Sequence, residues 1–515
     1  MTKEKERKMF VGVVWNCAAE LKLLLTAILF LFSLITILQF MPSRFSLSST
    51  SNLGTCVTAP SISTSNITTS NTVDSVSILI SAVNNVTANI PPPPPPALAK
   101  DEVLENGVVK RAFNPFGSAA YNFILMSAYR GGLDTFAVMG LASKPLHVYG
   151  KPSYTCEWIP NNNNKKSINV SGTKILPDWG YGRVYTVLVV NCTFPVPVGN
   201  SKNNTHGGKL LIHASTNGGG ETKFNMTDTF VALTESEQDF TKFISTFSKS
   251  PKYDFLYCGS SLYGNLSPQR VREWLAFHVR FFGKKSHFVI HDAGGVHEGV
   301  MAVLKPWMEK GYVTLQDIRD QERFDGYYHN QFLIVNDCLH KYRFQAKWMF
   351  FFDVDEFIFV PKKSTIKSVV DSLSAYTQFT IEQMPMSNKL CLEEDRGKSY
   401  RKWGFEKLVY KDVKRGIRRD RKYAVQPRNV IATGVHMSQN TVGKTTHKTE
   451  GRIKYFHYHG TIAEHREPCR QLVNTTTITI DQTPYEVDTT MRDIAGTVKR
   501  FELKMIGSTL QRTRQ

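Results

Sequence analysis

The sequence predicts an α/β domain with a doubly wound parallel sheet, preceded by an all-β sandwich and a single membrane-spanning helix. Three observations indicate this fold class. Residues 23–41 form an uncharged, strongly apolar run of 19. Residues 101–240 contain short apolar runs divided by Gly, Asn and Pro clusters, whereas residues 241–505 alternate strand-like and helix-like segments. A chain of 515 residues is long enough for two or three domains and their linkers.

The apolar run has the length of a helix that crosses a bilayer. Arg44 is the only basic residue between it and Lys100, whereas five precede it: Lys3, Lys5, Arg7, Lys8 and Lys22. The positive-inside rule therefore keeps residues 1–22 in the cytosol and sends the rest across the membrane. A cleaved signal peptide is the alternative, but the run is long for one and no small-residue cleavage site follows closely. Such a short span suits the thinner early secretory membranes.

Residues 42–100 are expected to form a stem that holds the body away from the membrane. They are rich in Ser, Thr and Asn, almost free of charge, and end in six prolines, Pro91 to Pro96. Polyproline rises about 3.1 Å per residue, so these prolines predict a stiff spacer of roughly 19 Å. A merely disordered tether is the alternative, and it predicts the same arrangement.

All eight N-glycosylation sequons lie after the apolar run, at Asn66, Asn85, Asn169, Asn191, Asn203, Asn225, Asn265 and Asn474. Their position supports a lumenal body. The chain carries 63 Lys and Arg against 44 Asp and Glu, a formal net charge of +19. That charge suits a polyanionic partner, and the lumenal location largely excludes nucleic acid.

Eight cysteines constrain the redox chemistry. Cys17 precedes the predicted span and seven follow it, an odd number, so at least one stays free or pairs between chains. None has the spacing of a metal site. Cys156 and Cys192 fall in the same predicted β domain, and we expect them to form a disulfide.

The expected β domain, residues 101–240, has four strand-like runs: "YNFILMSAYR", "DTFAVMGLA", "RVYTVLVVNCTFPV" and "GKLLIHAST". Their spacing is typical of an antiparallel sandwich. Five aromatic residues fall near strand ends: Tyr154, Trp158, Trp179, Tyr181 and Tyr185. Exposed aromatics there could stack on sugar rings, and buried ones would fill the core; the sequence leaves both readings open.

The following region alternates strands and helices. "YDFLYCGSSLYG" and "SHFVIHDAGG" each read as a strand and a turn, "PQRVREWLAFHVRFFG" and "YYHNQFLIVNDCLHKYR" as helices, and "PWMEKGYVTLQDI" as helix then strand. This order is typical of a parallel, doubly wound sheet, which binds ligands beyond the carboxyl ends of its strands.

The stretch "KWMFFFDVDEFIFVP" ends a strand on carboxylates. Its unbroken apolar run predicts a central parallel strand buried on both faces. In an extended chain Asp353 and Asp355 point to the same side, and two such oxygen ligands suit Mg²⁺ or Mn²⁺ shared with phosphates. This D-x-D arrangement is typical of metal-dependent sugar-nucleotide transferases, although an acidic turn after a strand is also common. We expect Glu356 to brace the turn.

Eight blocks in order resemble glycosyltransferase family 92 and, within it, the plant β-1,4-galactan synthases: "FLYCGSSLYGN", "HFVIHDAGG", "HNQFLIVNDCL", "FFFDVDEFIFVP", "TIEQMPMS", "RKWGFEKLVY", "QPRNVIATGVHMSQN" and "YFHYHGTI". The resemblance covers about residues 100–500. It implies a Golgi type II membrane enzyme with a GT-A catalytic domain and a carbohydrate-binding-module-like domain before it. It further implies transfer of galactose from UDP-galactose to β-1,4-galactan side chains of rhamnogalacturonan I pectin, with Mn²⁺ (or Mg²⁺), and possible homodimers.

A metal site of this kind usually takes a third ligand from a late histidine. "YFHYHG" offers His457 and His459, which share one strand face, and "GVHM" offers His436. We expect His457 to be the ligand, with His459 next. A lone histidine is more often a hydrogen-bonded core residue.

The donor nucleotide is expected along the ends of the first strands. Gly259, Ser260 and Ser261 form a small-residue turn that lets backbone approach a ligand. Further nucleotide candidates are His291, Asp292, Asn330, Gln331 and Asp337. Lys444 or His447, in a possible mobile loop of residues 443–448, could stabilise the leaving UDP. Turn formation or capping is the alternative role for the strand-end and helix residues.

Forming a β bond from an α-linked donor inverts the anomeric carbon and requires one carboxylate base. Glu406 in "WGFEK" is the expected base, and Trp403 could stack on the acceptor, because this block resembles the acceptor loop of other inverting galactosyltransferases. Glu382, Glu394 and Asp395 are the rivals. Residues 396–428 hold 13 Lys or Arg, either a solvated face or a polyanion site.

Two other functions remain open from the sequence. The enzyme could transfer another sugar or act on a glycoprotein glycan, or the chain could be a non-catalytic Golgi lectin or scaffold. The intact D-V-D motif and the late histidines favour an enzyme.

Overall fold

The computed structural model describes residues 98–513, apart from 118–120, 162–165, 201–205, 218–224, 325, 417–418 and 464. The expected cytosolic tail, the span at 23–41 and nearly all of the stem lie outside the described residues, as do Cys17, Cys56, Asn66, Asn85 and Asn203. Over the part of the chain that is described, no helix combines the length and the apolar character needed to cross a membrane.

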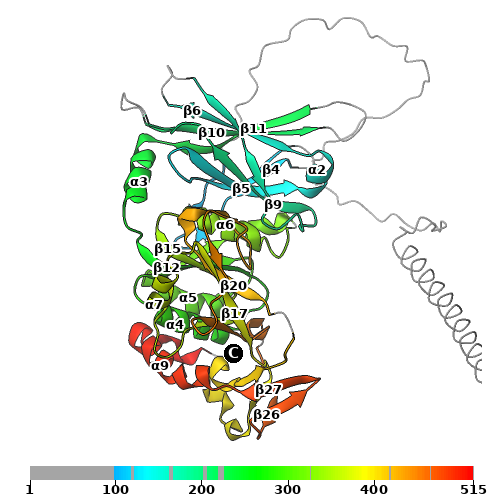
Figure 1. Cartoon of the computed structure of the whole chain (residues 1–515), viewed down its shortest axis with the longest axis vertical. Helices are drawn as coiled ribbons and strands as arrows, with labels where there is room; N and C mark the ends of the chain where they lie inside the picture. The colour runs from blue at the N-terminus through cyan, green and yellow to red at the C-terminus, as the bar shows by residue number, and fades with distance from the viewer. Residues whose placement is uncertain are drawn as a thin grey trace, which may run out of the picture. The chain divides into compact units, whose positions relative to one another are not determined.

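Two antiparallel sheets lie between residues 114 and 235 (Figure 1). The five-stranded sheet has the order β3 (Asn114–Phe116), β4 (Phe123–Arg130), β5 (Thr135–Ser143), β9 (Tyr185–Thr193) and β8 (Thr173–Ile175). The four-stranded sheet has the order β11 (Asn225–Glu235), β10 (Gly208–Asn217), β6 (Ser153–Pro160) and β7 (Ile168–Ser171). Helices α2 (Lys144–Tyr149) and α3 (Glu237–Ser248) accompany them. We call these two sheets the two-sheet unit.

The two sheets share one apolar core. Phe136 and Leu188 of the five-stranded sheet pack with Trp158 and Ile212 of the other. A disulfide between Cys156 on β6 and Cys192 on β9, with an S–S distance of 2.04 Å, joins the sheets and is the pair expected from the sequence. Of the five aromatic residues left open by the sequence, Tyr154 and Trp158 are in this core, whereas Trp179 and Tyr181 are 58% and 60% exposed. Tyr185 is half-buried.

The largest sheet has eleven strands and is mixed rather than wholly parallel. Strands β2, β14, β13, β12 and β15 run parallel, but β15 pairs antiparallel with β20, and β20 with β17. The order is β1 (Glu102–Val103), β2 (Val109–Lys110), β14 (Val313–Asp317), β13 (Ser286–Asp292), β12 (Tyr253–Leu262), β15 (Ala346–Phe351), β20 (Arg421–Val425), β17 (Gln378–Pro385), β24 (Lys454–His457) and β16 (Glu356–Phe359), with β23 (Thr445–Thr446) beside β17. The parallel prediction therefore holds for the strands from β2 to β15, whereas the strands beyond β15 pair in both directions.

Residues 102–110 also differ from the expected domain boundary. They were assigned to the β domain at 101–240, but β2 pairs in parallel with β14 and β1 with β2, at the edge of the large sheet. The described chain thus passes first through the edge of the large sheet, then forms the two-sheet unit, and returns to the large sheet at β12.

Each face of the large sheet is covered. The first contacts α4 (Pro268–Phe282), α5 (Glu298–Glu309) and α9 (Thr490–Ile506); the second contacts α6 (Gln331–Lys341) and the five-stranded sheet. Along β15, Trp348 and Phe350 join the first core, whereas Met349 and Phe351 join the second. Burial on both faces explains the unbroken apolar run of this strand. Figure 1 shows α6 between β4, β5 and β9 and the large sheet.

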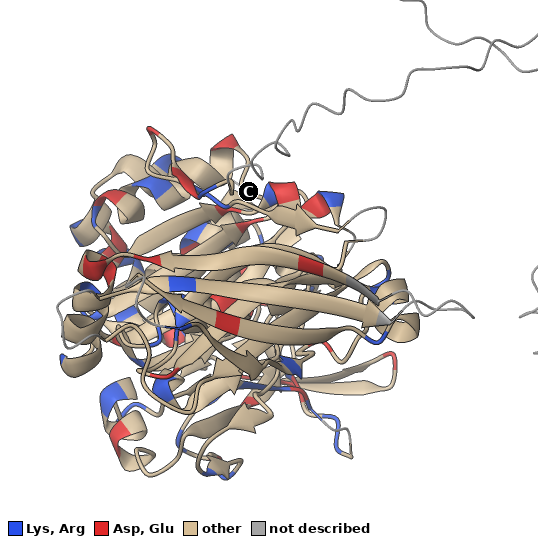
Figure 2. Ribbon diagram, turned by 90° about the horizontal axis from the view of Figure 1, so that it is seen from above, with Lys and Arg blue, Asp and Glu red and all other residues tan. Residues whose placement is uncertain are grey.

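Smaller elements complete the described chain. They are α7 (Ile366–Ser372), α8 (Gly404–Lys407), the pair β18 (Leu390–Leu392) and β25 (Gln471–Val473), the pair β21 (Val430–Ala432) and β22 (Asn440–Thr441), and a sheet of β19 (Tyr410–Asp412), β27 (Thr483–Val487) and β26 (Thr477–Ile480). Two more disulfides, Cys258–Cys338 and Cys391–Cys469, leave Cys56 as the odd cysteine after the predicted span. In Figure 2 the charged residues of both signs are interspersed on helices and loops, while the long central strands are mostly uncharged.

Candidate active site

The carboxyl ends of β12 and β15 border a cavity of about 590 Å³. This is the edge at which the sequence predicted a ligand site, and parallel strands commonly bind ligands there. The cavity has a polar part, which includes Asp353, Asp355, Lys422, His457 and His459, and an aromatic part, which includes Trp179, Tyr181, Tyr263, Tyr327 and Tyr328.

The D-V-D-E segment forms a tight turn between β15 and β16. The Glu356 amide donates to the Asp353 carbonyl at 3.2 Å, and the Asp353 amide donates to Glu356 Oε2 at 2.8 Å. Beneath the turn, Trp274 Nε1 donates to the carbonyls of both residues at 3.2 and 3.0 Å. The extended geometry predicted for Asp353 and Asp355 is therefore wrong, and the two carboxylates bind different partners. Glu356 braces the turn, as expected.

Asp355 faces two histidines. Possible ligand atoms of Asp355, His457 and His459 all lie within 4.8 Å of one another, and Asp355 Oδ1 is 3.5 Å from His457 Nε2. Glu356 pairs with His457 across β16 and β24, which fixes this approach. Burial favours the neutral ring, but the Asp355 carboxylate outweighs it and raises the pKa of His457. Any cation placed there would have the same electrostatic support.

A second contact orients the His457 ring. Gln383 Nε2 lies 2.5 Å from His457 Nδ1. Amide oxygen and nitrogen exchange places on a half-turn of the side chain, after which the oxygen would accept a hydrogen bond from Nδ1–H. That arrangement leaves Nε2 free to bind a metal, as is usual for ligating histidines. One carboxylate oxygen and two imidazole nitrogens form a donor set that fits a transition metal better than the oxygen-seeking Mg²⁺.

Asp353 binds a buried lysine instead. Lys422 Nζ donates to Asp353 Oδ2 at 2.7 Å and lies 3.7 Å from Glu356, while Gln331 Nε2 donates to Asp353 Oδ1 at 3.3 Å. Burial would raise the pKa of Asp353, but Lys422 outweighs it and lowers that pKa. Burial raises the pKa of Glu356 to about 8, although Lys422 opposes this. Lys422 belongs to the basic run of residues 396–428 but could not be singled out from the sequence, because β20 reaches this edge through its antiparallel pairing with β15.

Some nucleotide candidates lie at the cavity. Ser260, Ser261 and Gln331 line it, and Ser261 Oγ donates to the His329 carbonyl at 2.8 Å. A Cβ on Gly259 would lie 1.6 Å from the Tyr257 hydroxyl, so the packing there requires glycine. His436 also lines the cavity, and its Nδ1 lies 3.1 Å from the Arg421 carbonyl.

Other nucleotide candidates do not line the cavity. Asp292 Oδ1 accepts from the Gly294 and Val296 amides at 2.9 and 3.0 Å and closes a turn. The His291 ring is fully buried, which lowers its pKa to about 3. Lys444 is exposed, and its carbonyl accepts from the Thr377 amide at 2.8 Å. His447 Nδ1 lies 3.0 Å from Thr380 Oγ1.

Two helix candidates, Asn330 and Asp337, hold the fold together. Asn330 is buried at the start of α6, where its Nδ2 contacts Gln321 and donates to the Phe324 carbonyl at 3.3 Å. Asp337 forms a buried ion pair with Arg111 and accepts from two residues of β4, Ser127 Oγ at 2.7 Å and Tyr129 OH at 2.9 Å. Burial alone would raise the pKa of Asp337, but Arg111 holds it well below its usual range.

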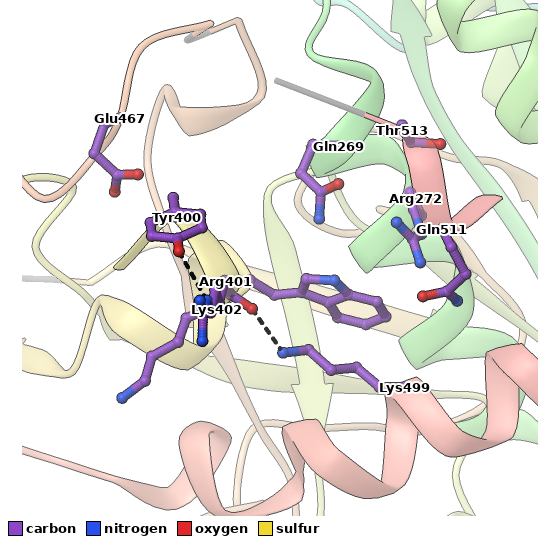
Figure 3. Close-up of a pocket in the computed structure, with 10 residues that line it drawn as sticks. Gln269, Arg272, Tyr400, Arg401, Lys402, Glu467, Lys499, Gln511 and Thr513 are labelled. Atoms are coloured by element: carbon purple, nitrogen blue, oxygen red, sulfur yellow. Dashed lines mark hydrogen bonds between the residues drawn. The ribbon is translucent and has the colours of Figure 1, made fainter. Parts of the chain in front are cut away.

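The expected stacking residue, Trp403, lines a different cavity of about 600 Å³ (Figure 3), and the expected base, Glu406, is the ion partner of Lys499 in the wall of that cavity. Trp403 is only 5% exposed and lies between the Arg272 guanidinium at 5.4 Å and Lys499 Nζ at 5.5 Å. Glu406 Oε2 accepts from the Trp403 amide at 3.0 Å and pairs with Lys499. Figure 3 shows Lys499 reaching toward the Arg401 carbonyl, to which it donates at 3.4 Å.

The rival bases are also outside the first cavity. Glu394 and Asp395 pair with Arg492, and Glu382 lies within β17 opposite Arg421 of β20. Besides Asp353, Asp355 and Glu356, the cavity is lined by a further carboxylate, Asp420, which was not among the predicted site residues. It directly precedes β20 and is exposed, so it reaches the cavity through the same strand pairing that positions Lys422.

The described sequons are mostly accessible. Asn169, Asn265 and Asn474 are exposed. Asn191 is half-buried, and its Nδ2 donates to Thr193 Oγ1 at 3.2 Å; Asn225 is the first residue of β11.

Comparisons with known proteins agree with the motif blocks. Residues 253–495 match the model of glycosyltransferase family 92. The chain is 58% identical to galactan beta-1,4-galactosyltransferase GALS3 of Arabidopsis thaliana, over 100% of both chains. It is 58% identical to galactan beta-1,4-galactosyltransferase GALS2 of the same plant, over 99% of this chain and 98% of that one, and 55% identical to GALS1 over 78% and 79%. This chain therefore belongs to glycosyltransferase family 92.

Proposed function

We propose that this chain is an inverting galactosyltransferase that transfers galactose from UDP-galactose to β-1,4-galactan side chains of rhamnogalacturonan I pectin. The observation that carries the proposal is the cluster of Asp355, His457 and His459 in a cavity at the strand ends of a family 92 fold. The names of the three Arabidopsis relatives support the donor sugar and the acceptor.

The proposed metal is Mn²⁺, held by Asp355, His457 and His459. When bound, it would supply positive charge that stabilises the departing diphosphate. Asp353, the other carboxylate of the D-x-D motif, is not in this cluster, and Lys422 fixes its orientation. Ser260 and Ser261, beside the required glycine at 259, are positioned to let the nucleotide approach the backbone at the end of β12.

The proposed base is Asp420 rather than Glu406. Inversion requires a carboxylate that reaches the acceptor hydroxyl in the cavity. Asp353 and Glu356 are occupied by Lys422, and Asp355 belongs to the metal cluster, whereas Asp420 lines the cavity and is exposed. Glu406 instead ties α8 to α9 through Lys499. We expect Asp420→Asn to lower kcat by about 10²–10⁴-fold, the usual contribution of a general base, with UDP-galactose binding retained.

The wider architecture follows from the same family membership. We propose a GT-A fold for the large sheet and a carbohydrate-binding-module-like sandwich for the two-sheet unit. An uncleaved anchor at 23–41 and a stem would place the body in the Golgi lumen as a type II protein, and a homodimer is compatible with the odd cysteine, Cys56.

The decisive test uses the full chain in detergent, labelled UDP-galactose and β-1,4-galactooligosaccharides. Extension should require Mn²⁺, stop with EDTA, and be lost in Asp355→Ala. Asp371→Ala is the matched control, because Asp371 is a surface carboxylate that pairs with Lys347 and Lys367. Release of UDP without extension would point to another acceptor, such as a glycoprotein glycan, and extension only with another nucleotide sugar to another donor. Absence of both transfer and UDP binding would favour a lectin or scaffold.

A further inference from the structure

Five exposed aromatic side chains gather at the cavity that contains the metal cluster. Trp179 and Tyr181 are 58% and 60% exposed, Tyr328 is 54% exposed, and Tyr263 and Tyr327 are each 39% exposed. All five line that cavity. We call them the aromatic belt. Exposed aromatic residues that gather in this way are typical of ligand-binding grooves rather than of surface without a binding role.

The rings of the belt follow one another without a break. Ring centroids are 6.1 Å apart between Trp179 and Tyr181, 5.8 Å between Tyr181 and Tyr327, and 6.1 Å between Tyr327 and Tyr328. Tyr263, directly after β12, is 6.5 Å from Tyr328. The belt therefore runs from the nucleotide end of the large sheet to the two-sheet unit.

The turn that carries Trp179 and Tyr181 is held in one conformation. The buried Asp178 accepts from the Gly180 amide at 3.1 Å, the Thr186 hydroxyl at 2.8 Å and the Val187 amide at 3.1 Å. A Cβ on Gly182 would lie 1.7 Å from the Tyr185 carbonyl oxygen. Trp179 itself has φ 53°, which a bulky residue rarely adopts. The surrounding structure thus fixes a strained tryptophan in an exposed position.

The turn that carries Tyr327 and Tyr328 shows the same feature. Tyr328, His329 and Asn330 have φ values of 55°, 52° and 55°. Tyr263 stacks on His329 at 3.9 Å, and the hydrogen bond from Ser261 Oγ holds the His329 carbonyl. Backbone strain of this kind gathers at ligand sites, where the surrounding contacts maintain it. Both turns present rigid aromatic rings, which lose little conformational entropy when a ligand binds.

The chemistry of the belt favours a neutral sugar. Its five side chains are one tryptophan and four tyrosines. The carboxylates, histidines and lysine of the cavity come from other segments: the D-V-D-E turn, Asp420 and Lys422 at the start of β20, His436 between β21 and β22, and His457 and His459 at and just after the end of β24. A galactopyranose unit presents one face of C–H groups that packs on a flat ring, and its hydroxyls can bond to tyrosine OH groups. A diphosphate would instead seek the metal and lysine end of the cavity.

We propose that Trp179, Tyr181 and Tyr327 bind sugar units of the galactan acceptor beyond the unit that receives galactose. The two-sheet unit is then part of the acceptor site and favours long acceptors over short ones. This inference rests on the proposed function, and it extends that function to the length of acceptor that the enzyme prefers.

The test compares Trp179→Ala and Tyr181→Ala with wild type in the full chain. The readout is the ratio of kcat/KM on a long β-1,4-galactooligosaccharide to kcat/KM on the disaccharide. Each variant should lower this ratio about tenfold, equivalent to about 1.4 kcal/mol, mainly through KM of the long acceptor. Tyr149→Ala is the matched control, since Tyr149 is 76% exposed on α2 and does not line the cavity. An unchanged ratio overturns the proposal, and so does a rise in KM for UDP-galactose alone, which assigns the belt to the nucleotide.

A binding measurement separates this inference from the proposed function. Calorimetry with the long oligosaccharide and no donor should show binding to wild type and to Tyr149→Ala, and at least tenfold weaker binding to Trp179→Ala. That result supports the acceptor site even if transfer fails, which would overturn the galactosyl-transfer proposal alone. Equal affinity in all three proteins, or no binding to wild type, overturns the acceptor site whatever the transfer assay shows.

Discussion

Two cavities of almost equal volume, about 590 and 600 Å³, differ in how their charges are paired. Around Trp403, Arg272 pairs with Glu502 and Lys499 with Glu406. Among the described residues of the other cavity, four carboxylates face one lysine and three histidines: Asp353, Asp355, Glu356, Asp420, Lys422, His436, His457 and His459. Volume does not distinguish the two cavities. The difference is that Asp353 and Glu356 share the single lysine of the metal-cluster cavity, so negative charge remains there for a cation to neutralise.

The largest effect should come from removing a ligand of the proposed metal site. His457→Ala should lower transfer by about 10³-fold, because several kcal/mol of charge stabilisation would depend on the metal that we propose it holds. Titration of metal-free protein with Mn²⁺ should show weakened binding in the same variant. Transfer rates within a few-fold of wild type would mean that the cluster of Asp355, His457 and His459 is not the metal site.

The buried ion pair between Arg111 and Asp337 should contribute to stability rather than to transfer. Asp337→Asn removes the buried ion partner of Arg111 and leaves it the more exposed Asp101 at 2.9 Å, so the free energy of unfolding should fall by about 3 kcal/mol. Denaturant unfolding measures this, with Asp371→Asn as an exposed counterpart worth about 0–1 kcal/mol. Mn²⁺ affinity should stay the same in both. Equal stability of the two variants would show that the Arg111–Asp337 pair does not hold the units together.

The stability of the protein should decrease at acid pH because of a buried histidine, His278, below the D-V-D-E turn. His278 Nδ1 lies 2.8 Å from the Trp274 carbonyl and Nε2 accepts from the Ile358 amide at 3.2 Å, and burial lowers its pKa to about 3. The unfolded-state pKa is about 6.5. The stabilisation that the neutral His278 ring gives to the folded state is therefore complete above pH 6.5. As pH falls, the free energy of unfolding decreases by about 1.4 kcal/mol per pH unit down to about pH 3.

The matched variant is His278→Gln, which cannot gain the proton. Unfolding free energies of both proteins should be measured from pH 7 to pH 5, and the variant should show the shallower slope. Parallel slopes would mean that His278 is protonated in the folded state.

The smallest effect is expected at the second cavity. Glu406→Gln removes the ion pair with Lys499, which is partly exposed and worth about 1 kcal/mol or less. Transfer should stay within about threefold of wild type. A loss of kcat comparable with that of Asp420→Asn would restore Glu406 as the base and remove the contrast between the cavities.

The sequence alone predicted the strands that are buried on both faces, because such a strand is a nearly unbroken run of apolar residues. The apolar run before Asp353 could only be a strand covered on both faces, and β15 is one. The late histidines were also found, because alternation in "YFHYHG" places His457 and His459 on one side of the chain.

Features that depend on distant pairing could not be predicted. Lys422 and Asp420 reach the cavity because β20 lies antiparallel to β15, and such a pairing leaves no local pattern. The position of Asp337 in its predicted helix is compatible with either a ligand contact or a buried ion pair. The structure shows the ion pair, with Arg111, which is distant in sequence. The helix expected from Tyr327 starts at Gln331, since three residues before it adopt positive φ.

The route of the chain through β1 and β2 limits how this protein can be divided. Strand β2 pairs with β14, and Arg111 directly after it binds Asp337, although the whole two-sheet unit separates these segments in sequence. A fragment that begins at residue 241 would lack two edge strands and Arg111, and would expose the apolar face that contacts Met139 and Val187. The two-sheet unit therefore resembles an insertion rather than a detachable module, and exchanging it between relatives should keep residues 102–111 with the catalytic sheet.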